Sequence, residues 1–136
     1  MLPVTSANVR LFLHVLGATV WVGGQIALAG VVPVVRRAAG ADMVRLVARR
    51  FQQVAWPAFA LLVATGIWNL VEVHIGDQDS QYFTTVFVKL VFVALSGVFA
   101  GLHVVYRGKP AIVGLFAALG LLFALAATFV GVQLHG

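Results

Sequence analysis

The sequence of 136 residues contains no cysteine, and this absence removes several kinds of chemistry at once. Without thiols the chain forms no disulfide bonds, thiolate-bound metal sites or iron–sulfur clusters. Charge is the second scarcity, because only 10% of the residues are charged and only four of these are acidic. Soluble domains carry about 25% charged residues to cover their surface. The composition therefore excludes an ordinary water-exposed globular fold.

Hydrophobic residues take the place of the missing charges, at 62% of the chain with a mean hydropathy of +1.04. A helix needs ~20 apolar residues to cross a hydrocarbon layer of ~30 Å, and four segments reach that length. The predicted helices cover residues 8–35, 51–73, 83–106 and 111–134. The first is too long for a signal peptide and has no clear cleavage site, so we expect it to be retained. The sequence predicts an all-α fold, a single domain over residues 1–136 that forms an antiparallel four-helix bundle in a lipid bilayer.

The basic residues indicate how this bundle is oriented. Seven of the nine lie in two predicted loops: Arg36, Arg37, Arg45, Arg49, Arg50, Arg107 and Lys109. The positive-inside rule then places both loops in the cytoplasm and both termini on the outer side, most simply in a bacterial inner membrane. Because topology explains the net charge, nucleic-acid binding is not expected. The stretch Asp42–Arg50 has helical character, and it either lies along the membrane surface or extends the next helix.

Polar side chains inside the apolar segments are the best pointers to function, because a bilayer makes them costly. Two predicted helices carry such stripes on one face: His14, Trp21 and Gln25 in the first, and Lys89, Ser96 and His103 in the third. Each stripe should face the protein interior, since facing lipid would leave its polar groups unsatisfied. His14 and Lys89 both lie about 9 Å from the outer helix ends at ~1.5 Å per residue. They predict a polar site near the outer side.

Plainer roles exist for two of these residues. Lys89 could extend its ammonium group outward to the membrane surface, or it could neutralise Glu72. His103 lies close to the cytoplasmic end, where it could simply bond a backbone carbonyl.

A further group of imidazoles and carboxylates lies near the predicted outer ends of the helices. These are ligand types that divalent transition metals accept. The candidate metal ligands are His14, His74, Asp77, Asp79 and His135. His74 and His135 lie at water-exposed ends, where a role as ordinary surface residues is the alternative.

The order of several short motifs resembles the CopD-like family of integral membrane proteins. That family has a first-helix histidine followed by Trp-x-Gly-Gly, then a basic-Phe pair, a Thr-Gly pair and a membrane lysine. In this chain the corresponding residues are His14, Trp21, Gly23, Gly24, Arg50, Phe51, Thr65, Gly66 and Lys89. The resemblance covers roughly Val9–Tyr106. It implies copper handling or transport across the membrane, with copper as the bound species. The sequence leaves open whether the chain catalyses a reaction, although its residues favour a protein without enzymatic activity.

The ligand chemistry only half supports copper. Copper(I) prefers sulfur ligands, and the chain offers only Met1 and Met43, whereas copper(II) accepts the imidazoles and carboxylates of the outer mouth. The pairing of His14 with Lys89 is also similar to the four-helix membrane protoporphyrinogen oxidases, which implies haem b as the alternative cofactor. The cofactor-binding residues would then be His14, Trp21, Gln25, Lys89 and His103. His14 and His103 should lie a bilayer core apart, so one haem would use only one of them.

A third alternative needs no cofactor. The apolar fourth helix could dock this chain to copies of itself or to a larger membrane complex, through the small residues Gly114, Ala118 and Gly120.

Overall fold

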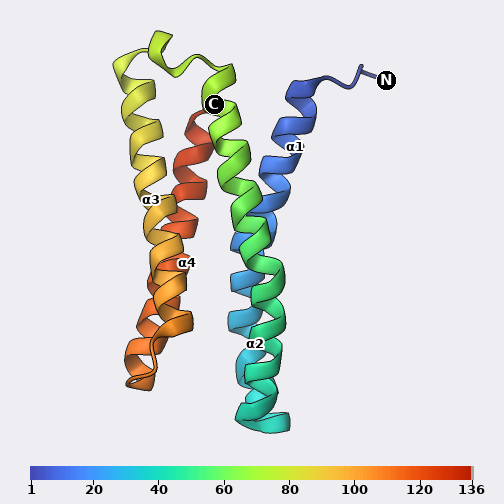
Figure 1. Cartoon of the computed structure of the whole chain (residues 1–136), viewed down its shortest axis with the longest axis vertical. Coiled ribbons are helices and arrows are strands. Elements are labelled where there is room, and N and C mark those ends of the chain that lie inside the picture. Colours follow the sequence, from blue (N-terminus) through green and yellow to red (C-terminus); the bar gives the residue numbers. More distant parts are fainter. Residues whose placement is uncertain (136) are drawn as a thin grey trace. The chain divides into compact units, whose positions relative to one another are not determined.

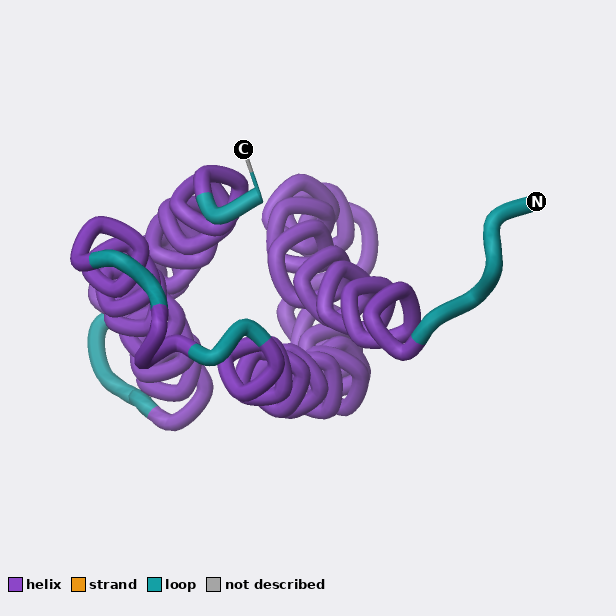
Figure 2. Tube along the Cα trace, turned by 90° about the horizontal axis from the view of Figure 1, so that it is seen from above, coloured by secondary structure: helices purple, strands orange, loops and turns teal. Residues whose placement is uncertain are grey.

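The computed structural model describes residues 1–135, and over that part of the chain it consists of helices joined by loops (Figures 1 and 2). The elements in chain order are α1 (Ser6–Ala18), the π-helix η1 (Thr19–Gly23), α2 (Gly24–Glu72), the short 3₁₀ helix η2 (Ile75–Asp77), α3 (Ser80–Val105) and α4 (Pro110–Gln133). Within residues 1–135, three helical stretches are long and apolar enough to cross a membrane: Ser6–Glu72, Ser80–Val105 and Pro110–Gln133. The all-α prediction is confirmed. The chain divides into two compact units, Met1–His74 and the part that begins at Ile75.

The first unit is a helical hairpin whose turn lies inside α2. Gly40 breaks the helical backbone there with φ 82° and ψ 177°, a conformation that glycine adopts without the strain a Cβ would cause. Contacts across the hairpin run in opposite directions, because Gly17 lies against Ala58 and Leu62 while Gly24 lies against Phe51. We call residues 6–39 the first arm and residues 41–72 the second arm; Figure 1 shows them side by side.

The arginine-rich segment after the turn extends the second arm. Its helix runs without interruption from the residue after Gly40 to Glu72, so it begins about ten residues before the predicted start at Phe51. Side-chain bonds three residues apart support it, from Arg45 to Asp42 at 2.8 Å and from Arg50 to Gln53 at 2.9 Å. Of the two expectations for Asp42–Arg50, the structure selects helix extension.

Local capping explains where other helices begin. Thr5 is the N-cap of α1 and forms a capping box with Asn8. Asp79 caps α3 by accepting the Tyr82 N–H at 2.7 Å. Pro110 opens α4 in the first turn, where a missing backbone N–H costs nothing.

The second unit packs α3 against α4 in another hairpin. Ser96 is 1% exposed and donates a hydrogen bond to the Gly120 carbonyl oxygen at 3.0 Å. The helices approach closely here, because a Cβ on Gly120 would lie 3.3 Å from the Ala100 backbone nitrogen. Next to this contact the rings of Phe99 and Phe123 stack at 5.6 Å and 11°. The close approach of the two backbones at Gly120 therefore determines how α3 and α4 pack, as in many pairs of membrane helices.

The close approach at Gly17 yields a testable expectation. A Cβ there would lie 3.0 Å from the Ala58 carbonyl oxygen and 3.1 Å from the Leu62 nitrogen, and backbone atoms cannot rotate away. Gly17→Ala should therefore push the arms apart and lower the free energy of unfolding by about 1–3 kcal/mol. Thermal unfolding in detergent, followed by circular dichroism, measures this loss.

Gly30→Ala is the matched control, because a Cβ at Gly30 meets no atom within 4 Å. Alanine there should leave stability unchanged or raise it through its better helix propensity. Equal effects from the two variants would contradict the close approach.

Candidate functional site

His14 is tied to the second arm by a hydrogen bond between its ring Nδ1 and the Thr65 hydroxyl, which lie 2.9 Å apart. Thr65 is 3% exposed, and its hydroxyl donates to the Leu61 carbonyl oxygen at 2.7 Å. Because the hydroxyl has one hydrogen and gives it to that carbonyl, its oxygen accepts from His14, so Nδ1 carries a proton. The neutral ring then has its lone pair on Nε2. The ring also packs over Gly66, where a Cβ would be 3.5 Å from Cε1.

Arg10 forms a second polar contact one helical turn before His14. Its Nε donates to the Asn69 Oδ1 at 2.6 Å, and its Nη1 lies 3.6 Å from the Glu72 Oε2. The guanidinium carbon is 5.9 Å from the centre of the Trp68 ring, and the Trp68 Nε1 donates to Glu72 at 3.3 Å. The Arg10 side chain is only 14% exposed, so these partners offset the cost of removing its charge from water.

Arg10 was not among the predicted site residues. Glu72 was expected as one possible partner of Lys89, whereas the structure pairs this carboxylate with Arg10. The signal was present, because Arg10 precedes His14 by four residues and so shares its helix face. Asn69 and Glu72 have the matching spacing on the second arm.

Trp21 and Gln25 lie further along the first arm, where η1 interrupts the α-helix. Trp21 is 3% exposed, and its ring centre lies 4.4 Å from that of Phe59 and 5.2 Å from that of Trp56. Gln25 donates from Nε2 to the Trp21 carbonyl oxygen at 2.9 Å. Here Trp21 joins the two arms through aromatic contacts, and Gln25 satisfies a backbone carbonyl. Single π-turns of this kind are frequent at functional sites.

Lys89 belongs to the second unit, where it packs across α4 at Gly131. A Cβ on Gly131 would lie 3.0 Å from the Lys89 Nζ and 3.2 Å from its Cε, so the glycine makes room for this side chain. His135 donates from Nδ1 to the Gly131 carbonyl oxygen at 3.1 Å. Lys89 therefore lies against its neighbouring helix, as expected for the stripe on α3.

His103 lies in the last turn of α3 and donates from Nδ1 to the Val113 carbonyl oxygen of α4 at 2.9 Å. This is the plainer arrangement that the sequence analysis considered for it. Lys89, Ser96 and His103 all contact α4, so the predicted stripe with a spacing of seven residues faces the partner helix within this unit.

Two of the three remaining candidate ligands have local structural partners. His74 follows α2 with a positive φ of 51° and donates from Nδ1 to the Val71 carbonyl oxygen at 3.1 Å. Asp79 caps α3, and Asp77 is exposed in η2. Over residues 1–135, neither unit gathers three or more His, Asp or Glu side chains that could hold one metal ion. The candidate metal ligands therefore do not form a closed site within either unit.

Comparison with protein families finds a match that spans half of the chain. A family model described as copper resistance protein D matches residues 45–112. The matched span contains Thr65 and Lys89, while His14 lies before it. Comparison with curated proteins and with solved structures gave no match. The resemblance inferred from the short motifs is confirmed at the level of the family.

The hydrogen bond from His14 to Thr65 generates one expectation. Thr65→Val keeps the side-chain shape but removes the acceptor, so it should lower the free energy of unfolding by about 1–3 kcal/mol. It should also release the ring from the tautomer with a proton on Nδ1. Nitrogen NMR of the histidine rings, together with thermal unfolding, tests both effects. Thr65→Ser keeps the hydroxyl and should preserve tautomer and stability. An unchanged tautomer in the valine variant would show that Thr65 does not hold the ring.

The position of Lys89 generates another expectation. A cysteine at this position should react slowly with a water-soluble maleimide in open membrane fragments, because the side chain packs on Gly131. Gly76→Cys is the control, since it lies in η2 with open space around it and should react rapidly. Equal labelling rates at the two positions would show that Lys89 extends to the membrane surface instead.

Proposed function

The chain belongs to the copper resistance protein D family, and from this premise we propose that it is an integral membrane protein that handles copper ions, with His14 as a contact point for the ion. The observation that carries the proposal is the hydrogen bond from the His14 Nδ1 to Thr65. Metal-binding histidines commonly donate one ring N–H to a fixed partner, which orients the other nitrogen toward the metal. Thr65 serves His14 in this way, and imidazole is a ligand that copper accepts.

The side chains available as ligands favour copper as a transported ion, bound only transiently, over copper as a permanently bound cofactor. The chain has no cysteine and two methionines, so the sulfur sites that hold copper(I) tightly are not available from its own side chains. Neither unit gathers three His, Asp or Glu side chains over the described residues. A copper ion that is held by one histidine and few further ligands binds weakly. Weak binding allows the ion to be released, which transport requires.

The neighbouring ion pair makes a cation tolerable near His14. Arg10 lies one helical turn away, and its positive charge alone would repel copper. Glu72, at 3.6 Å from the guanidinium, cancels most of that charge at longer range. Because the Glu72 side chain is 52% exposed, it is also the part of the pair that an arriving cation meets first.

We place this site near the outer side of the membrane. Gly40 divides the first long helical stretch into two arms, each longer than the ~20 residues needed for a crossing, which with α3 and α4 makes four crossings. The arginines around Gly40 and the basic residues Arg107 and Lys109 would lie in the cytoplasm of a bacterial inner membrane, with both termini outside. Lys89 would then lie at the depth of His14, and we assign it to the same polar site of a four-helix bundle.

The experiment begins with the protein purified in detergent, its visible absorption spectrum, metal analysis and a titration with copper(II). We expect copper uptake, and we expect His14→Ala to weaken it about tenfold or more, the scale on which changes at a metal site act. His103→Asn is the control. We leave His103 out of the proposed site because its imidazole bonds the Val113 carbonyl at the other end of α3, so copper affinity should stay unchanged.

Three outcomes would overturn the proposal. Full copper affinity in His14→Ala would remove His14 from the site. A Soret band with stoichiometric iron, lost in His14→Ala, would make the chain a haem b protein with His14 as an axial ligand. A protein that takes up neither copper nor haem would remove copper binding at His14 and favour a structural subunit of a larger membrane complex.

A further inference from the structure

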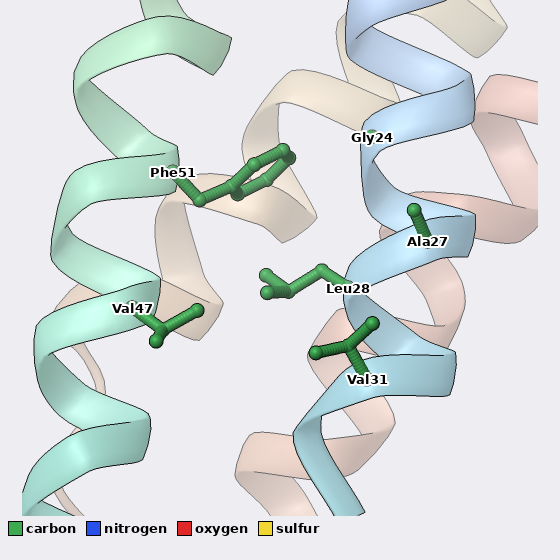
Figure 3. Close-up of a pocket in the computed structure, with 6 residues that line it drawn as sticks. All are labelled: Gly24, Ala27, Leu28, Val31, Val47 and Phe51. Atoms are coloured by element: carbon green, nitrogen blue, oxygen red, sulfur yellow. The ribbon is translucent and has the colours of Figure 1, made fainter. Parts of the chain in front are cut away.

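The first unit contains an apolar groove between its two arms, on the side of the hairpin nearer to Gly40. Four residues of the first arm and two of the second line it: Gly24, Ala27, Leu28, Val31, Val47 and Phe51. Figure 3 shows Leu28 and Val31 facing Val47 and Phe51 across the gap. The cavity has a volume of about 270 Å³ and no polar side chain in its lining. It lies just below the ~300 Å³ at which pockets for drug-sized ligands begin, so a narrow alkyl segment suits it better.

Glycine and phenylalanine shape one end of this groove. The Phe51 ring lies over Gly24, where a Cβ would come within 2.6 Å of the ring carbon Cε2. The first-arm residues recur at intervals of three and four, so they form one continuous stripe on the helix. The groove is therefore part of the contact between the two arms, with the Phe51 ring over Gly24 at the end nearer to Trp21.

Arginines follow the groove along both arms of the hairpin. Five of them, all exposed, lie between Val31 and Phe51 in the sequence: Arg36, Arg37, Arg45, Arg49 and Arg50. Asp42 is the one acidic residue between positions 36 and 50, and it pairs with Arg45 at 2.8 Å. The apolar groove is therefore next to a strongly basic segment around Gly40.

We propose that this groove binds one anionic phospholipid, with an acyl chain between the arms and the phosphate among the arginines. Charge complementarity identifies the ligand, because guanidinium groups bind phosphate oxygens in pairs. Clusters of four or more basic residues beside a membrane helix recruit anionic lipids, at about 1 kcal/mol or roughly fivefold per residue. The apolar groove adds a feature that a basic surface patch lacks, because it can hold one acyl chain of the lipid whose phosphate binds the arginines.

Quenching by brominated lipids tests the site in the intact protein. Trp21 precedes the groove residue Gly24 by three residues and its ring contacts that of Trp56 at 5.2 Å, so bromine atoms on a bound acyl chain should quench their fluorescence. In phosphatidylcholine vesicles, acyl-brominated phosphatidylglycerol should quench more strongly than acyl-brominated phosphatidylcholine at the same mole fraction, with about a fivefold preference or more. Replacing Arg36, Arg37 and Arg49 with glutamine should remove this preference.

Filling the groove separates a built site from simple attraction to basic residues. Val47→Phe and, as a second variant, Val31→Phe each place a ring in the cavity and should lower the preference while every arginine remains. Arg107→Gln with Lys109→Gln, in the other hairpin, should leave it unchanged. Equal quenching by the two lipids would overturn the proposal. A preference that survives both groove-filling variants would also overturn it, since the arginines alone would then attract the headgroup.

Discussion

Polar groups within these apolar helices depend on contacts with the neighbouring helix, and this constraint organises the whole molecule. A bilayer offers no water to an unsatisfied donor or acceptor, so each polar side chain on an inner face needs a partner within the protein. In the first hairpin Arg10 reaches Asn69 and Glu72, and His14 reaches Thr65. In the second hairpin Ser96 bonds the Gly120 carbonyl. These bonds require short distances between the arms, which glycines at positions 17 and 120 allow.

The sequence predicted much of this because helical spacing carries the information. The faces that hold His14 and Lys89 could be read from intervals of four and seven residues. Two features could not be read from spacing: the turn at Gly40 looks like one glycine among 14, and nothing in the sequence marks the π-turn at Trp21. Arg10 could have been read from its spacing of four residues to His14, but its partners Asn69 and Glu72 are about 60 residues away in the sequence.

The ligand chemistry and the family relationship constrain each other. The family concerns copper resistance, yet the chain lacks the sulfur ligands that hold copper(I) most tightly. A histidine held by Thr65 can still contact copper. The low affinity of such a contact is an advantage if the ion has to leave again. The ion pair of Arg10 and Glu72 also favours access of a cation, since Glu72 compensates the positive charge of Arg10 near His14. Tight closed coordination would fit storage, whereas an open contact fits passage.

The two inferred sites occupy opposite ends of one hairpin, and the aromatic contacts of Trp21 lie between them. His14 lies on one side of η1, and the groove begins at Gly24 on the other. A π-turn gives the first arm a local irregularity that the Gln25 side chain stabilises by bonding the Trp21 carbonyl. Phe51 against Gly24 and Trp21 against Phe59 are apolar contacts between the arms, and along the hairpin they lie between the hydrogen bond of His14 and the basic segment around Gly40.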